Sequence, residues 1–68
     1  MRSMKVKLNG QDKELNNSNL KQLIDESCRG NKHVIAEVNG AIIKGAQWEQ
    51  IHICDGDTIE LVSFVGGG

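Results

Sequence analysis

The sequence predicts an α+β domain, in which a mixed sheet of four to five strands carries one main helix on one face and a short second helix. Two short runs with strand-like composition flank an Asn-Gly pair at residues 9–10. Residues 19–28 change to the period of a helix, and strand-like runs return after residue 32. Because 68 residues with 38% apolar content form one small core, these elements must share a single domain.

The first two strands are expected at residues 4–8 and 11–15. The run "MKVKL" alternates apolar and charged residues, as a strand with one buried face does. Asn9-Gly10 follows at once, and this pair favours the type I′ turn of a hairpin because both central residues need positive φ. Polar residues make 11–15 the less distinctive strand of this hairpin.

The main helix is expected to begin after Asn19. Its core-facing stripe recurs at helical spacing and comprises Leu20, Leu23, Ile24, Ser27 and Cys28. Asn19 is a suitable N-cap, and Gln22 is expected to reach back to the Asn19 backbone as in a capping box. Gly30 provides the usual stop signal after the last turn.

A third strand follows, with Val34, Ala36 and Val38 on one face. An Asn-Gly turn at residues 39–40 leads into a short extended piece at 41–43. The run "GAQWEQI" predicts about two turns of helix, with its tryptophan at the edge of the core.

The last strand, at residues 58–65, presents different side chains on its two faces. Strand alternation places Ile59 and Leu61 on one face, and Val62 and Phe64 on the other. If the first pair meets the helix, the second pair points away from it. The final strand therefore contributes to the core and also carries apolar side chains on the open face of the sheet.

The order of these elements favours the ubiquitin-like β-grasp for residues 4–65. We expect the strand after the helix to lie parallel to the first strand, and the last strand to lie near the middle of the sheet. The second methionine, at position 4, makes residues 1–3 a candidate expression remnant. Residues 66–68 are three glycines and are expected to form a flexible tail.

Composition excludes several classes of partner. The formal net charge is −1, and the lysines and arginines are dispersed rather than gathered into a run that would bind nucleic acid. No apolar stretch approaches the roughly 20 residues that span a bilayer, and no signal-peptide core precedes the domain. We therefore expect a cytoplasmic protein with neither nucleic-acid nor membrane partners.

The residue types that bind metals are present, but their spacing is not that of common metal sites. Cys28 and Cys54 are expected to be reduced thiols, because the chain has no export signal. Together with His33 and His52 they match no common zinc motif, so we predict no metal site. The stretch "DGD" at 55–57 lacks the other ligands of a calcium loop and predicts a hairpin turn.

The C-terminal "VGGG" is the feature that packing explains least. Three extended residues reach about 10 Å, enough to carry the Gly68 carboxylate into the active site of another protein. Nothing on this chain activates a carboxylate, but a partner that uses ATP can convert it to an acyl adenylate. A sulfur donor such as a partner's persulfide can then displace AMP and leave a thiocarboxylate.

The run "VIAEVNGAIIKGAQWEQIHICDGDTIELVSFVGGG" resembles the C-terminal half of the ThiS family of thiamine-biosynthesis sulfur carriers. Members typically show V-N-x-x-x-V, a tryptophan, D-G-D-x-I-E and a terminal V-G-G or V-G-G-G. "NLKQLIDE" is similar to the family's helix region, so the resemblance covers residues 4–68. Ile43 and Asn19 are conservative departures, standing where valine and threonine are common.

This resemblance implies a β-grasp fold and a role for each tail residue. Gly68 would carry the sulfur, after a ThiF-like enzyme adenylates it with ATP, and would donate it to a ThiG-like thiazole synthase. Gly66 and Gly67 match the flexible part of the family tail. Neither an enzyme activity nor a bound cofactor is expected on this chain, since the ATP belongs to the activating partner.

A docking surface for such a partner is predicted beside the tail. Val62, Phe64 and Val65 would offer apolar contacts there. The alternative is that Phe64 only covers the open face of the sheet.

Three other functions remain open from the sequence. The chain could serve a different sulfur pathway, as MoaD-like carriers do for molybdopterin, although those are usually longer. It could be a ubiquitin-like modifier, in which an amine rather than sulfide attacks the activated carbonyl. It could also be a structural β-grasp module whose tail has no role.

Overall fold

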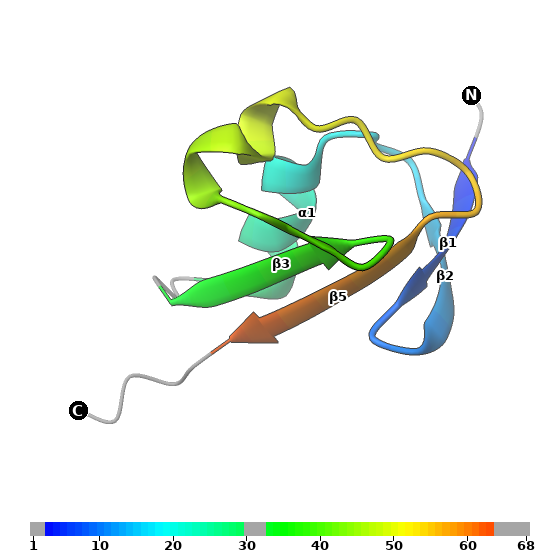
Figure 1. Cartoon of the computed structure of the whole chain (residues 1–68). Helices are drawn as coiled ribbons and strands as arrows, with labels where there is room; N and C mark the ends of the chain where they lie inside the picture. Colours follow the sequence, from blue (N-terminus) through cyan, green and yellow to red (C-terminus); the bar gives the residue numbers. More distant parts are fainter. Residues whose placement is uncertain (1–2, 30–32, 64–68) are drawn as a thin grey trace.

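The computed structural model describes residues 3–29 and 33–63, which form a twisted sheet with a helix against one face (Figure 1). In chain order the elements are β1 (Met4–Leu8), β2 (Gln11–Leu15), α1 (Leu20–Ser27), β3 (Val34–Val38), β4 (Ala41–Ile43), the 3₁₀ helix η1 (Gly45–Gln50) and β5 (Thr58–Ser63). The predicted α+β architecture, with one main helix and a small second one, is confirmed.

The five strands lie in the order β2-β1-β5-β3-β4, so the last strand is at the centre, as predicted. The expected direction of β3 is wrong. It is β5 that runs parallel to β1, and β3 runs antiparallel to β5. The strand that enters the helix is β2, so the crossover through α1 makes β3 parallel to β2 and hence antiparallel to β1.

Both predicted Asn-Gly turns are present, and each joins two antiparallel strands. Asn9 and Asn39 have φ of 52° and 53°, and the glycine after each has φ of 81° and 85°. Positive φ at two successive positions is what a type I′ turn requires, and asparagine adopts it more readily than most residues. The two Asn-Gly pairs therefore set the register of the β1–β2 and β3–β4 hairpins.

The N-terminus of α1 differs in one detail from the expectation. Asn19 is the N-cap, with its Oδ1 accepting from the Gln22 amide at 3.0 Å. However, it is Asn17 that completes the cap. Its Oδ1 accepts from the Asn19 amide at 2.8 Å, and its Nδ2 donates to Gln22 Oε1 at 2.7 Å. The Gln22 side chain is thus held by Asn17 instead of closing a capping box.

The helix is eight residues long and ends at Ser27. Ser27 is exposed, contrary to the predicted stripe, and the buried residues of the helix end at Ile24. Cys28 forms the C-cap and packs partly against the core, while Gly30 lies outside the described residues. No helix in the described part of the chain has the length and apolar character to cross a membrane.

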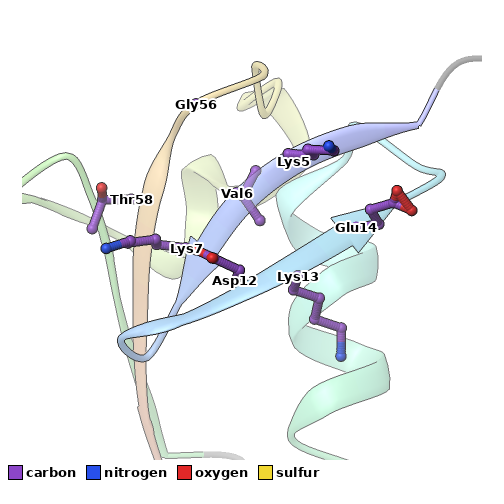
Figure 2. A pocket seen from close by; sticks show the side chains of 8 residues that line it. All are labelled: Lys5, Val6, Lys7, Asp12, Lys13, Glu14, Gly56 and Thr58. Atoms are coloured by element: carbon purple, nitrogen blue, oxygen red, sulfur yellow. The ribbon is translucent and has the colours of Figure 1, made fainter.

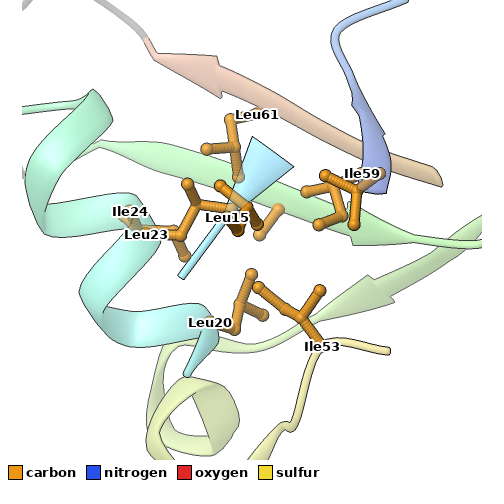
Figure 3. Close-up of a cluster of buried hydrophobic side chains, with 9 residues drawn as sticks. Leu15, Leu20, Leu23, Ile24, Ile53, Ile59 and Leu61 are labelled. Carbon is orange, nitrogen blue, oxygen red and sulfur yellow. The ribbon is translucent and has the colours of Figure 1, made fainter. Parts of the chain in front are cut away.

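The core lies between α1 and the inner face of the sheet (Figure 3). Its buried members are Val6, Leu15, Leu20, Leu23, Ile24, Ala36, Ile53, Ile59 and Leu61. Leu20 from the helix and Ile59 from the central strand are fully buried. The alternation predicted for β1, β3 and β5 accordingly brings one face of each strand to the helix.

Trp48 closes the edge of this core, as predicted. It is half-buried on η1, packs against the core cluster, and donates from Nε1 to the Ile43 carbonyl at 2.9 Å. The short helix is therefore joined to the end of β4 by a side-chain hydrogen bond as well as by apolar contact.

Candidate functional site

The predicted site begins where β5 ends. β5 runs from Thr58 to Ser63 as the central strand of the sheet. Gly66, Gly67 and Gly68, together with Phe64 and Val65, lie outside the described residues. Their predicted roles in sulfur transfer and docking stay predictions. The structure describes the surface around Ser63, the last residue before this segment.

Val62 is the predicted docking residue that the structure describes. It lies on the outer face of the sheet, opposite α1, and 48% of it is exposed. Ile35 is its register partner on β3 and is 39% exposed, while Ile42 on the edge strand β4 is 68% exposed. We call Ile35, Ile42 and Val62 the outer apolar patch. An exposed group of large apolar side chains is a common mark of a protein contact.

Two carboxylates share this part of the outer face. Glu37 lies opposite Ile42 on one side and opposite Glu60 on the other. Like charges directly across two strands are unfavourable, so the Glu37–Glu60 pair does not stabilise the fold. The outer apolar patch therefore has two acidic side chains next to it on the same face of the sheet.

Sequence reasoning missed Ile35, Ile42 and the Glu37–Glu60 pair. The signal for Ile35 and Glu37 was available, since they alternate with the predicted inward residues of β3. The meeting of Glu37 with Glu60 was not available, because it depends on which strand lies next to β3.

The Asp55-Gly56-Asp57 stretch is a turn, as predicted, and it holds the opposite end of β5. Gly56 has φ of 89°. Asp55 Oδ1 accepts from the Lys5 amide at 2.7 Å, and Asp57 Oδ2 accepts from the Cys54 amide at 2.8 Å. The expectation of a hairpin is wrong, because the turn ties β5 to β1 instead of joining two antiparallel strands.

The cysteines and histidines do not form a candidate centre. Cys28 and Cys54 are both free thiols, one half-buried at the end of α1 and the other exposed before the turn. In residues 3–29 and 33–63, no three side chains among His, Cys, Asp and Glu gather as a metal ion requires.

A hollow of about 690 Å³ lies over the β1–β2 hairpin (Figure 2). It is lined by Lys5, Val6, Lys7, Asp12, Lys13, Glu14, Gly56 and Thr58. Lys5 lies opposite Glu14, and Lys7 lies opposite Asp12, so the two signs of charge compensate across the strands. Because this hollow adjoins the start of β5, it is at the end of the strand far from the tail.

Comparison with known proteins connects this geometry to a family. A sequence profile of the ThiS family matches residues 6–68. The sulfur carrier protein ThiS of Bacillus subtilis is 37% identical over 65 residues, covering 93% of this chain and 98% of that protein. A thiazole synthase of Paramagnetospirillum magneticum is 32% identical over 66 residues, which cover 96% of this chain but only 20% of that protein.

A solved structure gives the same result for the fold. The crystal structure of the thiamine biosynthesis protein ThiS from Geobacter metallireducens superimposes with a TM-score of 0.78 at 25% identity. The alignment covers 96% of this chain and 100% of that one. The β-grasp fold is therefore shared with a ThiS protein over nearly the whole chain.

Proposed function

Since this chain belongs to the ThiS family, we propose that its working group is the C-terminal carboxylate of Gly68, which carries sulfur as a thiocarboxylate. The chain is a sulfur carrier of thiamine biosynthesis and not an enzyme. Its own residues hold and present the tail, and a partner performs the chemistry.

Activation comes first, because a carboxylate is a poor electrophile at neutral pH. In the proposed reaction a Gly68 carboxylate oxygen attacks the α-phosphate of ATP, pyrophosphate leaves, and an acyl adenylate forms. Sulfide or its equivalent then attacks the acyl carbon, and AMP departs with the carboxylate oxygen. When the donor is a persulfide, a thiol must afterwards cleave the S–S bond to free the thiocarboxylate.

The position of β5 is the observation that carries this proposal. The strand is hydrogen-bonded on both sides at its start, so it is fixed in the middle of the sheet. The last described residue, Ser63, is exposed, and only five residues of sequence follow it. A strand fixed in the sheet, followed in the sequence by Phe64, Val65 and then three glycines, suits a terminal group that must enter a narrow site, since glycine has no Cβ to obstruct entry.

Two partners are proposed in sequence. A ThiF-like enzyme would adenylate Gly68, and a thiazole synthase would accept the sulfur. The thiazole synthase of P. magneticum supports the second partner, because a fifth of that protein is similar to this whole chain. A protein of that name therefore contains a carrier-like segment of its own.

The outer apolar patch is the proposed docking surface for the activating enzyme. It contains Val62 and Ile35, which lie next to the start of the tail. Phe64 and Val65 are proposed to extend it. The Glu37–Glu60 pair lies on the same face of the sheet, next to this patch. The surface therefore fits a partner that presents a basic side chain among apolar ones.

Intact mass tests the chemistry. We expect the chain to gain about 16 Da after incubation with ATP, a ThiF-like enzyme and a sulfur source, because sulfur replaces one oxygen. Deleting Gly68 should abolish the gain and leave thermal unfolding unchanged. An amine adduct in place of the sulfur would indicate a modifier, and no gain under conditions that charge a known carrier would refute the proposal.

Substitutions on β5 test the docking surface. Phe64→Ala and Val62→Ala should each raise the concentration of carrier needed for half-maximal adenylation and leave unfolding cooperative. Thr58→Ala is the matched control, because Thr58 is exposed on the same strand at its other end. Equal affinities in all three variants would remove the patch from the interface.

A further inference from the structure

The central strand has a complete partner on one side only. β3 pairs with every residue of β5 from Ile59 to Ser63. β1 pairs only with Thr58 and Ile59, the first two residues of the strand. The half of β5 next to the tail is thus internal to the sheet on one side and an edge on the other.

Backbone hydrogen bonds show which groups face that edge. The Lys7 amide donates to the Asp57 carbonyl, and the Asn9 amide donates to the Ile59 carbonyl, both at 2.9 Å. Leu61 is next in the alternation, and its amide donates to Asn9 Oδ1 at 2.8 Å. On this side of β5, the Leu61 amide is thus paired with the Asn9 side chain and not with the backbone of a strand.

Ser63 follows Leu61 in this alternation. Its amide and carbonyl point to the same side as those of Leu61, since residues two apart in a strand share their direction. β1 has already turned away at Asn9, where φ is 52°. In the described ranges no hydrogen bond engages the Ser63 backbone on that side, and the residue is exposed. Unpaired backbone groups of this kind are a template for another strand.

We propose that an extended segment of the activating enzyme adds to the sheet here, alongside Leu61–Ser63 and beyond the Asn9 turn. This inference rests on the proposed function, because the occupant is the enzyme that must receive the tail. Strand addition would fix the direction of β5 at the last residue before the tail. The chemistry expected of the occupant is a free backbone edge with apolar side chains toward Val62.

Two features favour the enzyme over a second copy of this chain. The edge is continuous with the outer apolar patch, because Val62 lies between Leu61 and Ser63 and is 48% exposed. It is also very short, with room for few hydrogen bonds before the sequence reaches its glycines. A pair of copies would gain little from so short a ladder and would direct both tails into the same contact.

Proline at position 63 tests the inference. Ser63→Pro removes the amide hydrogen that faces the edge, and this amide takes no part in pairing with β3, so the fold should persist. We expect about five- to thirty-fold weaker binding to the adenylating enzyme, the factor for one or two lost backbone interactions. Ser63→Ala removes only the hydroxyl and should weaken binding less. Equal losses in the two variants, or none in Ser63→Pro, would overturn the proposal.

Amide hydrogen exchange on the unmodified chain gives an independent readout. The Ser63 amide should exchange fast in the free carrier and slowly in the complex, while the Val62 amide, which faces β3, should be protected in both. No change at Ser63 on binding would refute strand addition. Protection that appears without the enzyme and grows with carrier concentration would indicate a second copy and would also refute it.

The proposed function and the proposed strand addition fail separately. If the wild-type chain gains sulfur but Ser63→Pro is charged equally well, the proposed function holds and the strand addition is wrong. If the wild-type chain gains no sulfur under competent conditions, the proposed function itself is wrong.

Discussion

The inner and outer faces of the sheet differ in burial and in charge, although the same strands form both. On β5, Ile59 is fully buried against the helix, whereas Val62 is 48% exposed on the other side. Among the described residues, the buried core of the inner face contains no charged side chain. The outer face instead places Glu37 directly opposite Glu60. Such a pair costs stability, so the outer face is not arranged for the fold alone.

This difference separates stability from interaction. One face holds the domain together, and the other carries the proposed docking surface. Substitutions on the inner face should therefore change unfolding, and those on the outer face should change binding.

The largest effect is expected from Ile59→Ala. Loss of a fully buried side chain leaves a cavity and should lower the free energy of unfolding by about 2–5 kcal/mol. Val62→Ala, on the same strand, should lower it by less than about 1 kcal/mol. Urea unfolding of both variants measures the contrast. Similar losses in the two would mean that the faces are not energetically distinct.

A smaller effect is expected at the turn that holds β5 beside the tail. Asn9→Ala removes the acceptor of the Leu61 amide and places a residue poorly suited to positive φ, and should cost about 2 kcal/mol. Asn9→Gly keeps the turn and loses only the acceptor, so it should cost about 1 kcal/mol. Thermal unfolding distinguishes the two variants. An unchanged midpoint in Asn9→Gly would show that the hydrogen bond from the Leu61 amide to Asn9 Oδ1 does not stabilise the fold.

Asn19→Ala should cost about 1 kcal/mol, the usual effect of removing an N-cap. The loss acts on the inner layer, because α1 supplies much of the core. Asn19→Asp keeps the capping acceptor and loses only the Nδ2 donor to the Glu49 carbonyl, so it should cost less than Asn19→Ala. At a temperature where Asn19→Ala stays folded, its adenylation should match wild type. A binding defect there would contradict the assignment of stability to the inner face and binding to the outer face.

The smallest effect is expected from Glu60→Gln. Relief of the Glu37–Glu60 repulsion should raise stability by roughly 0.2–1 kcal/mol at low salt and by less at high salt. Glu14→Gln should act in the opposite direction, because Glu14 lies opposite Lys5. Unfolding at two salt concentrations checks the signs. Destabilisation by Glu60→Gln would mean that the carboxylate pair supports the fold.

Local pattern was enough to predict the bounds of β1 and β2, the two Asn-Gly turns and the position of Trp48 at the core edge. Each depends on residues close together in the chain. The errors were of another kind. The direction of β3 depends on which groups meet in space, and the 55–57 turn was misread as a hairpin for the same reason. The role of Asn17 at the helix cap is an exception, because Asn17 lies only two residues before Asn19 and was overlooked.

The sequence by itself determined the turns, the alternating faces and the glycine ending, because φ preferences and the periods of strands and helices act over a few residues. Only the tertiary structure decided that Asn9 holds Leu61, 52 residues away, and that Asn39 Oδ1 accepts from the amide of Thr58, 19 residues away. Only the fold, likewise, left the Ser63 backbone at an open edge. Such contacts follow from strand order, which depends on how the whole chain buries its apolar surface.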